Sequence, residues 1–227
     1  MQKLNVLYED NHIIVVEKIV NIPSQADKTG DLDMLTIIKD YIKEKYNKPG
    51  NVYLGLVHRL DRPVGGVMVF AKTSKAASRL SEEVRAKQFE KRYLVIANGK
   101  FEKDKGTLED YLLKNQAKNI SKVVKEGTKN SKLAKLDYEV IKYDPDLNLS
   151  VLKINLHTGR HHQIRVQLSS RAHSIYGDQK YGGRGHGKQI CLWAYSLKII
   201  HPITKEVMKF ELYPQKIGSW KILEDCI

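Results

Sequence analysis

The apolar residues of this chain gather in short runs separated by polar turns, and this spacing limits the folds open to it. Runs at residues 4–8 and 13–17 are rich in Val and Ile and predict an N-terminal β-hairpin. A run at 67–71 predicts a buried strand, and residues 192–212 predict a late hairpin. Since few helices interrupt these strands, we expect an α+β fold with a mixed, largely antiparallel β-sheet and flanking helices.

Helical spacing of apolar residues occurs in three segments. Residues 33–46 carry apolar side chains three and four positions apart, with Asp31 or Asp33 available as the N-cap. Ser74 is the expected cap of a second helix. A third helix is expected after residue 160, with these residues facing inward: Ile164, Leu168 and Ala172.

The rest of the chain predicts further strands within one domain. Strands are expected at 91–97 and 152–156, and exposed strands and loops in the lysine-rich segment 98–135. A chain of 227 residues with 41% hydrophobic residues can bury a substantial core. Because neither a linker nor an internal repeat interrupts it, we expect a single compact domain over 1–227.

The charge of the chain suits a polyanionic partner. Lys and Arg number 39 against 26 for Asp and Glu, a net charge of +13. RNA, DNA and anionic membranes remain open on charge alone, as does simple solubility. Cys191 and Cys226 belong to no CxxC pair, so neither a disulfide framework nor a zinc site is expected. The start lacks the apolar run of a signal peptide and no stretch approaches a membrane span, so we expect a cytoplasmic protein without a membrane partner.

One segment places a single carboxylate among cations. The sequence His-Arg-Leu-Asp-Arg puts Asp61 among His58, Arg59 and Arg62, and residues 63–66 give a rigid, tight approach to the following strand. Neighbouring positive charge keeps a carboxylate ionised, as a nucleophile near a phosphate backbone requires. A structural Arg–Asp ion pair in a loop is the alternative interpretation.

A second polar cluster lies in the segment Thr-Gly-Arg-His-His-Gln-Ile-Arg. Its donors Arg160, His162, Gln163 and Arg165 suit phosphate or base-edge recognition. Helical spacing would put His161 and His162 near the face that carries Arg165. Metal ligands on one helix usually lie four residues apart and no acidic ligand is close by, so we expect no metal site.

These segments resemble the motifs of the RluA family, the pseudouridine synthases of large-subunit ribosomal RNA and transfer RNA. Residues 57–66 resemble the family's His-Arg-Leu-Asp motif. The resemblance extends over nearly the whole chain, through these further stretches: 7–18, 91–95, 158–165, 177–182 and His201-Pro202.

The resemblance implies the pseudouridine synthase fold, isomerisation of uridine in RNA and no cofactor. It implies that Asp61 is the catalytic aspartate, Tyr93 the active-site tyrosine and Arg165 the basic partner of the aspartate. The expected partner is large-subunit ribosomal RNA or transfer RNA, bound by a monomer. The residues expected to bind RNA are His58, Arg59, Arg62, Arg160, His162 and Gln163.

The chain departs from the family pattern at several positions. Ile19 stands in place of the Pro of a Lys-Pro-x-Gly turn, and Gly65 stands where Ser is frequent. His161 stands where Thr is usual, while Gln167 and Trp193 stand where His is usual. These changes bear on substrate detail and loop geometry. The family's frequent N-terminal S4 domain is not expected, because the catalytic pattern begins within the first ten residues.

Two other functions fit parts of the pattern. An inactive RNA-binding protein of the same fold would use the same charge, but the retained catalytic residue types argue against it. A metal-dependent nuclease would need a cluster of carboxylates, and only the pair His161 and His162 points that way. The sequence leaves open which uridine is modified, and whether Asp61 attacks the base or acts at the sugar.

Overall fold

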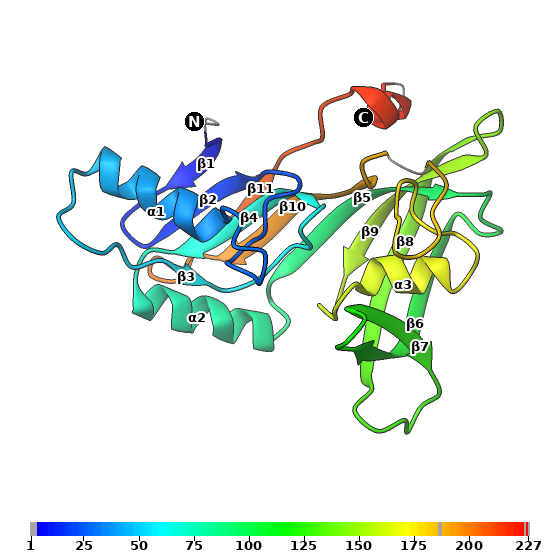
Figure 1. Cartoon of the computed structure of the whole chain (residues 1–227), viewed down its shortest axis with the longest axis horizontal. Helices are drawn as coiled ribbons and strands as arrows, with labels where there is room; N and C mark the ends of the chain where they lie inside the picture. The colour runs from blue at the N-terminus through cyan, green and yellow to red at the C-terminus, as the bar shows by residue number, and fades with distance from the viewer. Residues whose placement is uncertain (1–3, 186–187, 225, 227) are drawn as a thin grey trace. The chain divides into compact units, whose positions relative to one another are not determined.

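The computed structural model describes residues 4–185, 188–224 and 226. The chain folds into two compact units (Figure 1). Unit 1 comprises the residues up to Glu90 together with Ala194–Tyr213, and unit 2 comprises Lys91–Trp193 with the residues from Pro214 on. The expectation of one domain over 1–227 stays a prediction.

The strands of unit 1 follow the order β1-β2-β4-β10, with β3 beside β4 and β11 beside β10. The pairs β1–β2, β2–β4, β3–β4 and β10–β11 are antiparallel, so both predicted hairpins are confirmed. The elements of this unit are β1 (Val6–Glu9), β2 (Ile13–Lys18), α1 (Met34–Lys45), β3 (Gly55–Leu56), β4 (Gly65–Ala71), α2 (Ser74–Arg85), β10 (Leu192–Ile200) and β11 (Val207–Glu211).

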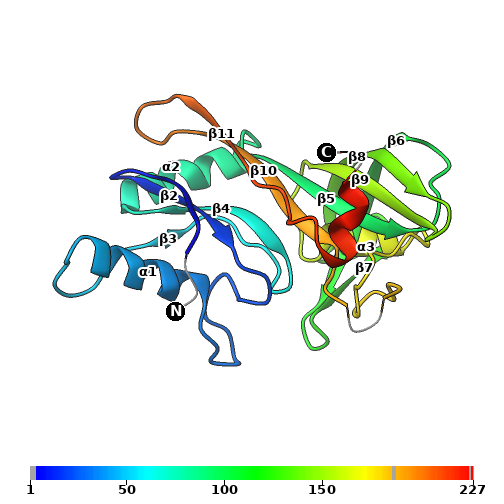
Figure 2. The same cartoon turned by 90° about the horizontal axis from the view of Figure 1, so that it is seen from above.

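Strands β2 and β4 are buried on both faces, which explains their nearly continuous apolar sequence. Because side chains alternate along a strand, Ile13 and Val15 point to one face and Ile14 and Val16 to the other. The first pair lies in one cluster with Leu80 of α2. Figure 2 shows α1 and α2 on either side of these strands, so each helix covers one face.

The helix starts of unit 1 follow from local capping. The Asp33 carboxylate accepts hydrogen bonds from the backbone N–H groups of Leu35 and Thr36, which confirms one of the two predicted caps of α1. The prediction of Ser74 as the cap of α2 is wrong by one residue. Thr73 has extended backbone and its side chain accepts from Ala76 N, while Ser74 is already helical.

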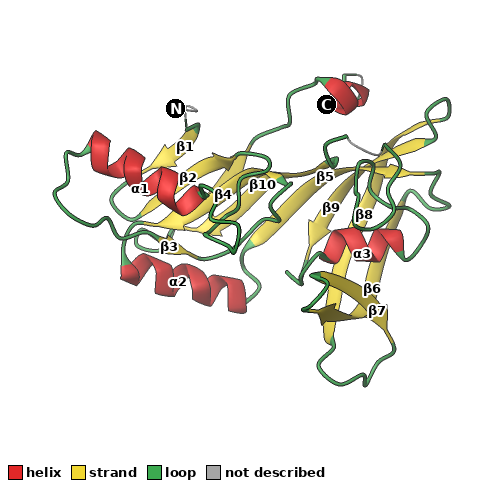
Figure 3. Cartoon of the chain, viewed as in Figure 1, coloured by secondary structure: helices red, strands yellow, loops and turns green. Residues whose placement is uncertain are grey.

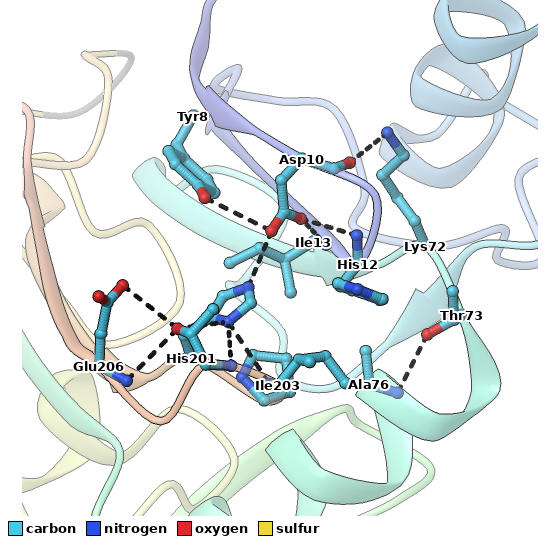
Figure 4. A network of polar contacts seen from close by, with 12 residues as sticks. Tyr8, Asp10, His12, Ile13, Lys72, Thr73, Ala76, His201, Ile203 and Glu206 are labelled. Carbon is cyan, nitrogen blue, oxygen red and sulfur yellow. Dashed lines mark hydrogen bonds and ion pairs between the residues drawn. The ribbon is translucent and has the colours of Figure 1, made fainter.

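A buried histidine joins the two turns of unit 1 (Figure 4). In the β1–β2 turn, Asp10 accepts from the backbone N–H groups of His12 and Ile13, both at 2.7 Å. Its other oxygen lies 2.9 Å from His201 Nε2, in the β10–β11 turn. His201 Nδ1 accepts from Thr204 N at 3.0 Å, so Nε2 carries the hydrogen that is donated to Asp10.

Gly66, the second residue of β4, stands where only glycine fits. Its φ is +126°, and a Cβ there would lie 2.2 Å from the carbonyl oxygen of Ala194. Gly66→Ala should therefore lower the free energy of unfolding by about 3 kcal/mol or more, from backbone strain and overpacking together. Gly50→Ala is the matched control, because Gly50 also has positive φ but meets no atom within 4 Å, and should cost only about 1 kcal/mol. Equal urea midpoints for the two variants would contradict this explanation.

Unit 2 is built on a sheet in the order β5-β9-β8-β6-β7, in which each neighbouring pair is antiparallel. Figure 3 shows α3 packed beside the strands of this sheet. The elements of this unit are β5 (Glu90–Asn98), β6 (Lys105–Asn115), β7 (Ile120–Val124), β8 (Lys132–Asp144), β9 (Leu149–Leu156), α3 (Gln163–Ser169) and the 3-10 helix η1 (Gly218–Leu223).

The core of unit 2 includes residues that the sequence predicted to be exposed. Leu112 of β6 and Ala134 of β8 are buried against Val166 of α3, although their segment is rich in lysine. Helix α3 is also shorter than predicted. Ile164 is buried as expected, but Ala172 lies beyond the helix end in left-handed backbone, with φ of 62°, and is exposed.

The predicted α+β class with a mostly antiparallel sheet is confirmed by these pairings. Within residues 4–185, 188–224 and 226, no helix has the length and apolar character needed to cross a membrane.

Candidate active site

Asp61 lies in the loop between β3 and β4, and backbone contacts fix this loop. Leu60 is buried, and its carbonyl accepts from the Ser24 hydroxyl at 3.0 Å, while its N–H donates to the same hydroxyl at 3.3 Å. Val64 N donates to the Asp61 carbonyl at 2.9 Å and closes a turn. Asp61 itself is half-buried. The backbone on either side of Asp61 is therefore held in place by its neighbours and by the turn.

Lys18 supports the same loop from inside unit 1. The residue is fully buried, and Nζ donates to the carbonyls of Ile19, Arg62 and Val64 at 3.0, 2.9 and 2.7 Å. Three acceptors match the three hydrogens of an ammonium group. Burial lowers the pKa of Lys18 to about 7; the carboxylate of Asp61 opposes this shift, and the charge of Arg62 adds to it. Two of the three carbonyls are in the Asp61 turn, so Lys18 fixes that turn.

The lowered pKa of Lys18 predicts a pH-dependent stability. Below about pH 7 this lysine is charged in both states, but between about 7 and 10.5 only the unfolded chain keeps the proton. The free energy of unfolding should then rise with pH, by up to about 1.4 kcal/mol per pH unit. Between pH 7 and 9, urea denaturation should show the free energy of unfolding of the wild type rising by about 2–3 kcal/mol more than that of Lys18→Met. Lys43 is exposed, so the pH dependence of Lys43→Met should match that of the wild type. The same pH dependence in Lys18→Met as in the wild type would contradict the lowered pKa of Lys18.

Arg62, the residue after Asp61, is bound to an acidic loop. Its Nη2 pairs with Asp31, its Nη1 donates to Thr29 Oγ1 at 3.2 Å, and its Nε donates to the Asn21 carbonyl at 3.1 Å. Asp27 lies 3.9 Å from Nη1. Hydrogen bonding from Arg62 lowers the pKa of Asp31. Acidic residues therefore balance the charge of Arg62 in this structure.

The other two basic residues of the motif, His58 and Arg59, differ in their surroundings. His58 Nε2 accepts from Val69 N at 3.2 Å, and its ring lies edge-on to Phe89 at 5.0 Å, so His58 packs against β4. Arg59 is exposed. Among the motif's three predicted RNA-binding residues, Arg59 is exposed, His58 packs against β4 and Arg62 pairs with acidic side chains.

In unit 2, Tyr93 lies on β5 and is buried. It stands opposite Ile154 in the antiparallel ladder between β5 and β9. That ladder runs without a bulge, so the register of β5 determines the face to which Tyr93 points.

Arg165, on α3, has a buried acidic partner that the sequence reasoning missed. Its Nε and Nη2 each donate at 2.7 Å, to the two oxygens of Asp178. The side chains of this pair are only 5% and 0% exposed. Asp178 also accepts from the backbone N–H groups of Lys180 and Tyr181, at 3.0 and 3.3 Å. Asp178 belongs to the Gly-Asp-Gln-Lys-Tyr-Gly segment, which resembles a family motif, but the sequence did not predict that it pairs with Arg165.

Gln163 stabilises the turn before α3. Its amide oxygen accepts from the Thr158 hydroxyl at 2.7 Å and from Arg160 N at 3.1 Å, while its amide nitrogen donates to the Lys135 carbonyl at 3.1 Å. Gln163 is buried, whereas Arg160 is exposed and donates through Nε to the Leu133 carbonyl at 2.8 Å. The structure thus gives Gln163 a role inside the protein, and its binding to RNA stays a prediction.

The helical placement of the histidine pair is wrong. His162 has left-handed backbone, with φ of 53°, and precedes the first residue of α3, so helical spacing does not apply to it or to His161. The two rings stack at 3.7 Å. His162 Nδ1 lies 2.9 Å from the hydroxyl of Tyr181, and His161 Nδ1 lies 2.9 Å from that of Ser121. Both rings therefore contact residues outside the helix, and the left-handed backbone belongs to His162.

The predicted site residues divide between the two units. His58, Arg59, Asp61 and Arg62 share one loop of unit 1, and the structure brings together Arg160, His162, Gln163 and Arg165 in unit 2, where Tyr93 lies on β5. The pairing of Arg165 with Asp61 stays a prediction. In the described part of the chain, no group of three or more His, Cys, Asp or Glu side chains is placed to hold a metal ion.

Solved structures share this fold. The human RNA Pseudouridylate Synthase Domain Containing 4 matches with a TM-score of 0.79 and 20% identity, over 93% of this chain and 89% of that one. The human RNA Pseudouridylate Synthase Domain Containing 1 matches with a TM-score of 0.75 and 22% identity, over 96% and 86%. At these identities the likeness shows the pseudouridine synthase fold.

Sequence relatives are more similar. An uncharacterized RNA pseudouridine synthase of Aquifex aeolicus is 34% identical over 92% of this chain and 69% of its own length. Ribosomal large subunit pseudouridine synthase D of Haemophilus influenzae is 31% identical over 91% and 66%. Synthase C of Salmonella typhimurium is 32% identical over 91% and 65%. The family model described as RNA pseudouridylate synthase matches residues 12–170. The chain therefore belongs to the RNA pseudouridylate synthase family, isomerases that act on uridine in RNA.

Proposed function

We propose that this enzyme converts specific uridines of large-subunit ribosomal RNA or transfer RNA to pseudouridine, with Asp61 as its nucleophile. The observation that carries the proposal is the carboxylate of the His-Arg-Leu-Asp motif on a turn held by Ser24 and Lys18. Two relatives are named as ribosomal large subunit synthases, which favours ribosomal RNA over transfer RNA.

The reaction moves uracil on its own ribose. The N1–C1′ glycosidic bond breaks, the uracil rotates, and a C5–C1′ bond forms. The proton on C5 leaves and N1 gains one, so the reaction needs neither a redox step nor an external group. Asp61 assists either by adding to the base or by stabilising the sugar, and both routes require an ionised carboxylate.

Arg165 and Tyr93 have separate roles in this proposal. Arg165 keeps the reacting carboxylate ionised and orients it through charge-assisted hydrogen bonds. The target base must leave its stack, at a cost on the order of a few kcal/mol. Stacking on the ring of Tyr93 recovers about 1–3 kcal/mol, and the Tyr93 hydroxyl is suited to assist removal of the C5 proton.

Pseudouridine mapping tests the function and identifies the substrate together. Total RNA from cells with and without the gene should differ at one or a few uridines of large-subunit ribosomal RNA. The purified enzyme should then modify the same uridines in a transcript of that RNA. Identical maps, with no modification of any ribosomal or transfer RNA by the purified protein, would favour an RNA-binding protein without activity.

RNA binding should weaken steeply with salt, because the chain carries a net charge of +13. Release of counterions from about four to six phosphates gives a log–log slope of roughly −3 to −4. Arg59→Ala should make this slope shallower by about 0.7, since Arg59 is exposed. Arg62→Ala is the matched comparison and should change it less, because Asp31 and Asp27 already balance that charge.

Titrations at several salt concentrations measure these slopes. Wild-type affinity that is independent of salt would contradict phosphate docking by this basic surface. Equal slopes for Arg59→Ala and wild type would remove Arg59 from the RNA contacts.

A further inference from the structure

Asp178 and Tyr181 contact the guanidinium of Arg165 in different ways. Along one edge, Nε and Nη2 donate to both oxygens of Asp178. In addition, Cζ of Arg165 lies over the ring of Tyr181, 5.3 Å from the ring centroid. A two-point contact along one edge still allows the guanidinium plane to swing about the line through the carboxylate. A cation–π contact with the Tyr181 ring opposes that swing, because the swing would carry the guanidinium away from the ring.

Tyr181 is itself fixed at both ends. Its hydroxyl oxygen accepts from Ser121 N at 2.7 Å and lies 2.9 Å from His162 Nδ1. Its backbone carbonyl accepts from the Ser169 hydroxyl at 2.8 Å. The rings of His162 and Tyr181 meet edge to face, at 5.6 Å and 87°. These contacts leave the Tyr181 ring little freedom to move away from Arg165.

His162 is placed for this contact by an uncommon backbone. Its φ of 53° and ψ of 29° lie in the left-handed region, which residues with a side chain rarely adopt. The ring of His161 stacks on it, and His161 Nε2 in turn lies 3.0 Å from Asn119 Oδ1. A left-handed residue persists where its surroundings fix it, often at a functional site.

We propose that Tyr181, held by His162 and Ser121, is a positioning residue that fixes the plane of the Arg165 guanidinium. The inference rests on the proposed role of Arg165 beside the reacting carboxylate. With Asp178 along one edge and the Tyr181 ring beside Cζ, Arg165 presents its charge in one orientation. A guanidinium free to swing would stabilise the same ion less well, since the strength of such contacts depends on angle.

Steady-state kinetics test this role. Tyr181→Leu should lower kcat by about 10- to 100-fold, as misplacement of a catalytic group does, with KM for RNA changed less than about 2-fold. Tyr181→Phe keeps the ring and loses only the hydroxyl, so its loss should be smaller. Tyr143→Leu is the matched control in unit 2, because Tyr143 bonds Asn148 and lies outside this network. It should leave both constants unchanged.

A double-variant cycle asks whether Tyr181 acts through Arg165. Lys has no guanidinium plane, so in an Arg165→Lys background Tyr181→Leu should change kcat by less than about 2-fold. If the loss were as large as in the wild-type background, Tyr181 would act independently of Arg165. The proposal would then be overturned.

A measurement on the side chain itself separates this inference from the proposed function. The order parameter of the Arg165 Nε–Hε group, from ¹⁵N relaxation, should fall in Tyr181→Leu and hold in Tyr143→Leu. An unchanged order parameter in Tyr181→Leu would overturn the positioning role. A fall in the order parameter, in a protein that forms no pseudouridine, would support the positioning contact and contradict the proposed function alone.

Discussion

Asp61→Asn should abolish pseudouridine formation while the protein stays folded. Asparagine keeps the shape of the side chain and removes the charge on which both reaction routes depend. Loss of a nucleophile costs a rate factor of at least about 10⁴ in well-studied hydrolases, and we expect a loss of that order here. The loop should survive, because Ser24 and Lys18 hold it through backbone atoms of Leu60, Arg62 and Val64.

Tritium release from RNA labelled at C5 of uridine measures this loss directly, since C5 gives up its hydrogen when it bonds C1′. Asp40→Asn is the matched control, because Asp40 is an exposed aspartate of α1 in the same unit. It should retain full activity. Release by Asp61→Asn at a rate near that of the wild type would remove Asp61 as the nucleophile.

Arg165→Met should destabilise the fold as well as stop the reaction. It leaves the carboxylate of Asp178 with 0% exposure and without its cation. Removing one partner of a buried ion pair costs about 3–5 kcal/mol. Arg165→Met with Asp178→Asn should recover much of that stability, since an amide carries no charge and its oxygen still accepts from Lys180 N and Tyr181 N. Activity should remain lost in the double variant.

Urea denaturation of the single and double variants, with tritium release, separates the two roles of Arg165. Arg171→Met is the matched control, because Arg171 pairs with Asp110 at 2.9 Å while its side chain is 37% exposed. It should cost less than about 1 kcal/mol. If Arg165→Met cost no more than Arg171→Met, the buried pair would contribute little to the fold. Recovered activity in the double variant would remove Arg165 from catalysis.

Local rules predicted much of unit 1. The apolar runs gave β2 and β4, and α1 follows from its spacing and from the Asp33 cap. A cap depends on a side chain and backbone N–H groups two or three residues away, so the sequence contains nearly all of its information. The predicted cap at Ser74 is wrong by only one residue. Thr73 and Ser74 are equally able to cap, and only the backbone angles distinguish them.

Helix α3 shows where local rules stop. The apolar spacing of Ile164, Leu168 and Ala172 continues past the helix, but the helix itself runs only over Gln163–Ser169. His162 before it and Ala172 after it both have left-handed backbone. Contacts of His162 with Tyr181, which is 19 residues further along the chain, contribute to that outcome. Periodicity predicts which face is buried but not where contacts with distant residues end the helix.

Sequence alone was enough for the two hairpins, the buried strand β4, the excess of positive charge and, through resemblance, the family and the catalytic candidates Asp61, Tyr93 and Arg165. Only the tertiary structure decided that Lys18 is buried beneath the Asp61 turn and that Arg165 is held by Asp178. The difference lies in how far apart along the chain the interacting residues are. Periodicity and caps depend on neighbours within a few residues, whereas the burial of a charge depends on partners such as Val64, 46 residues from Lys18.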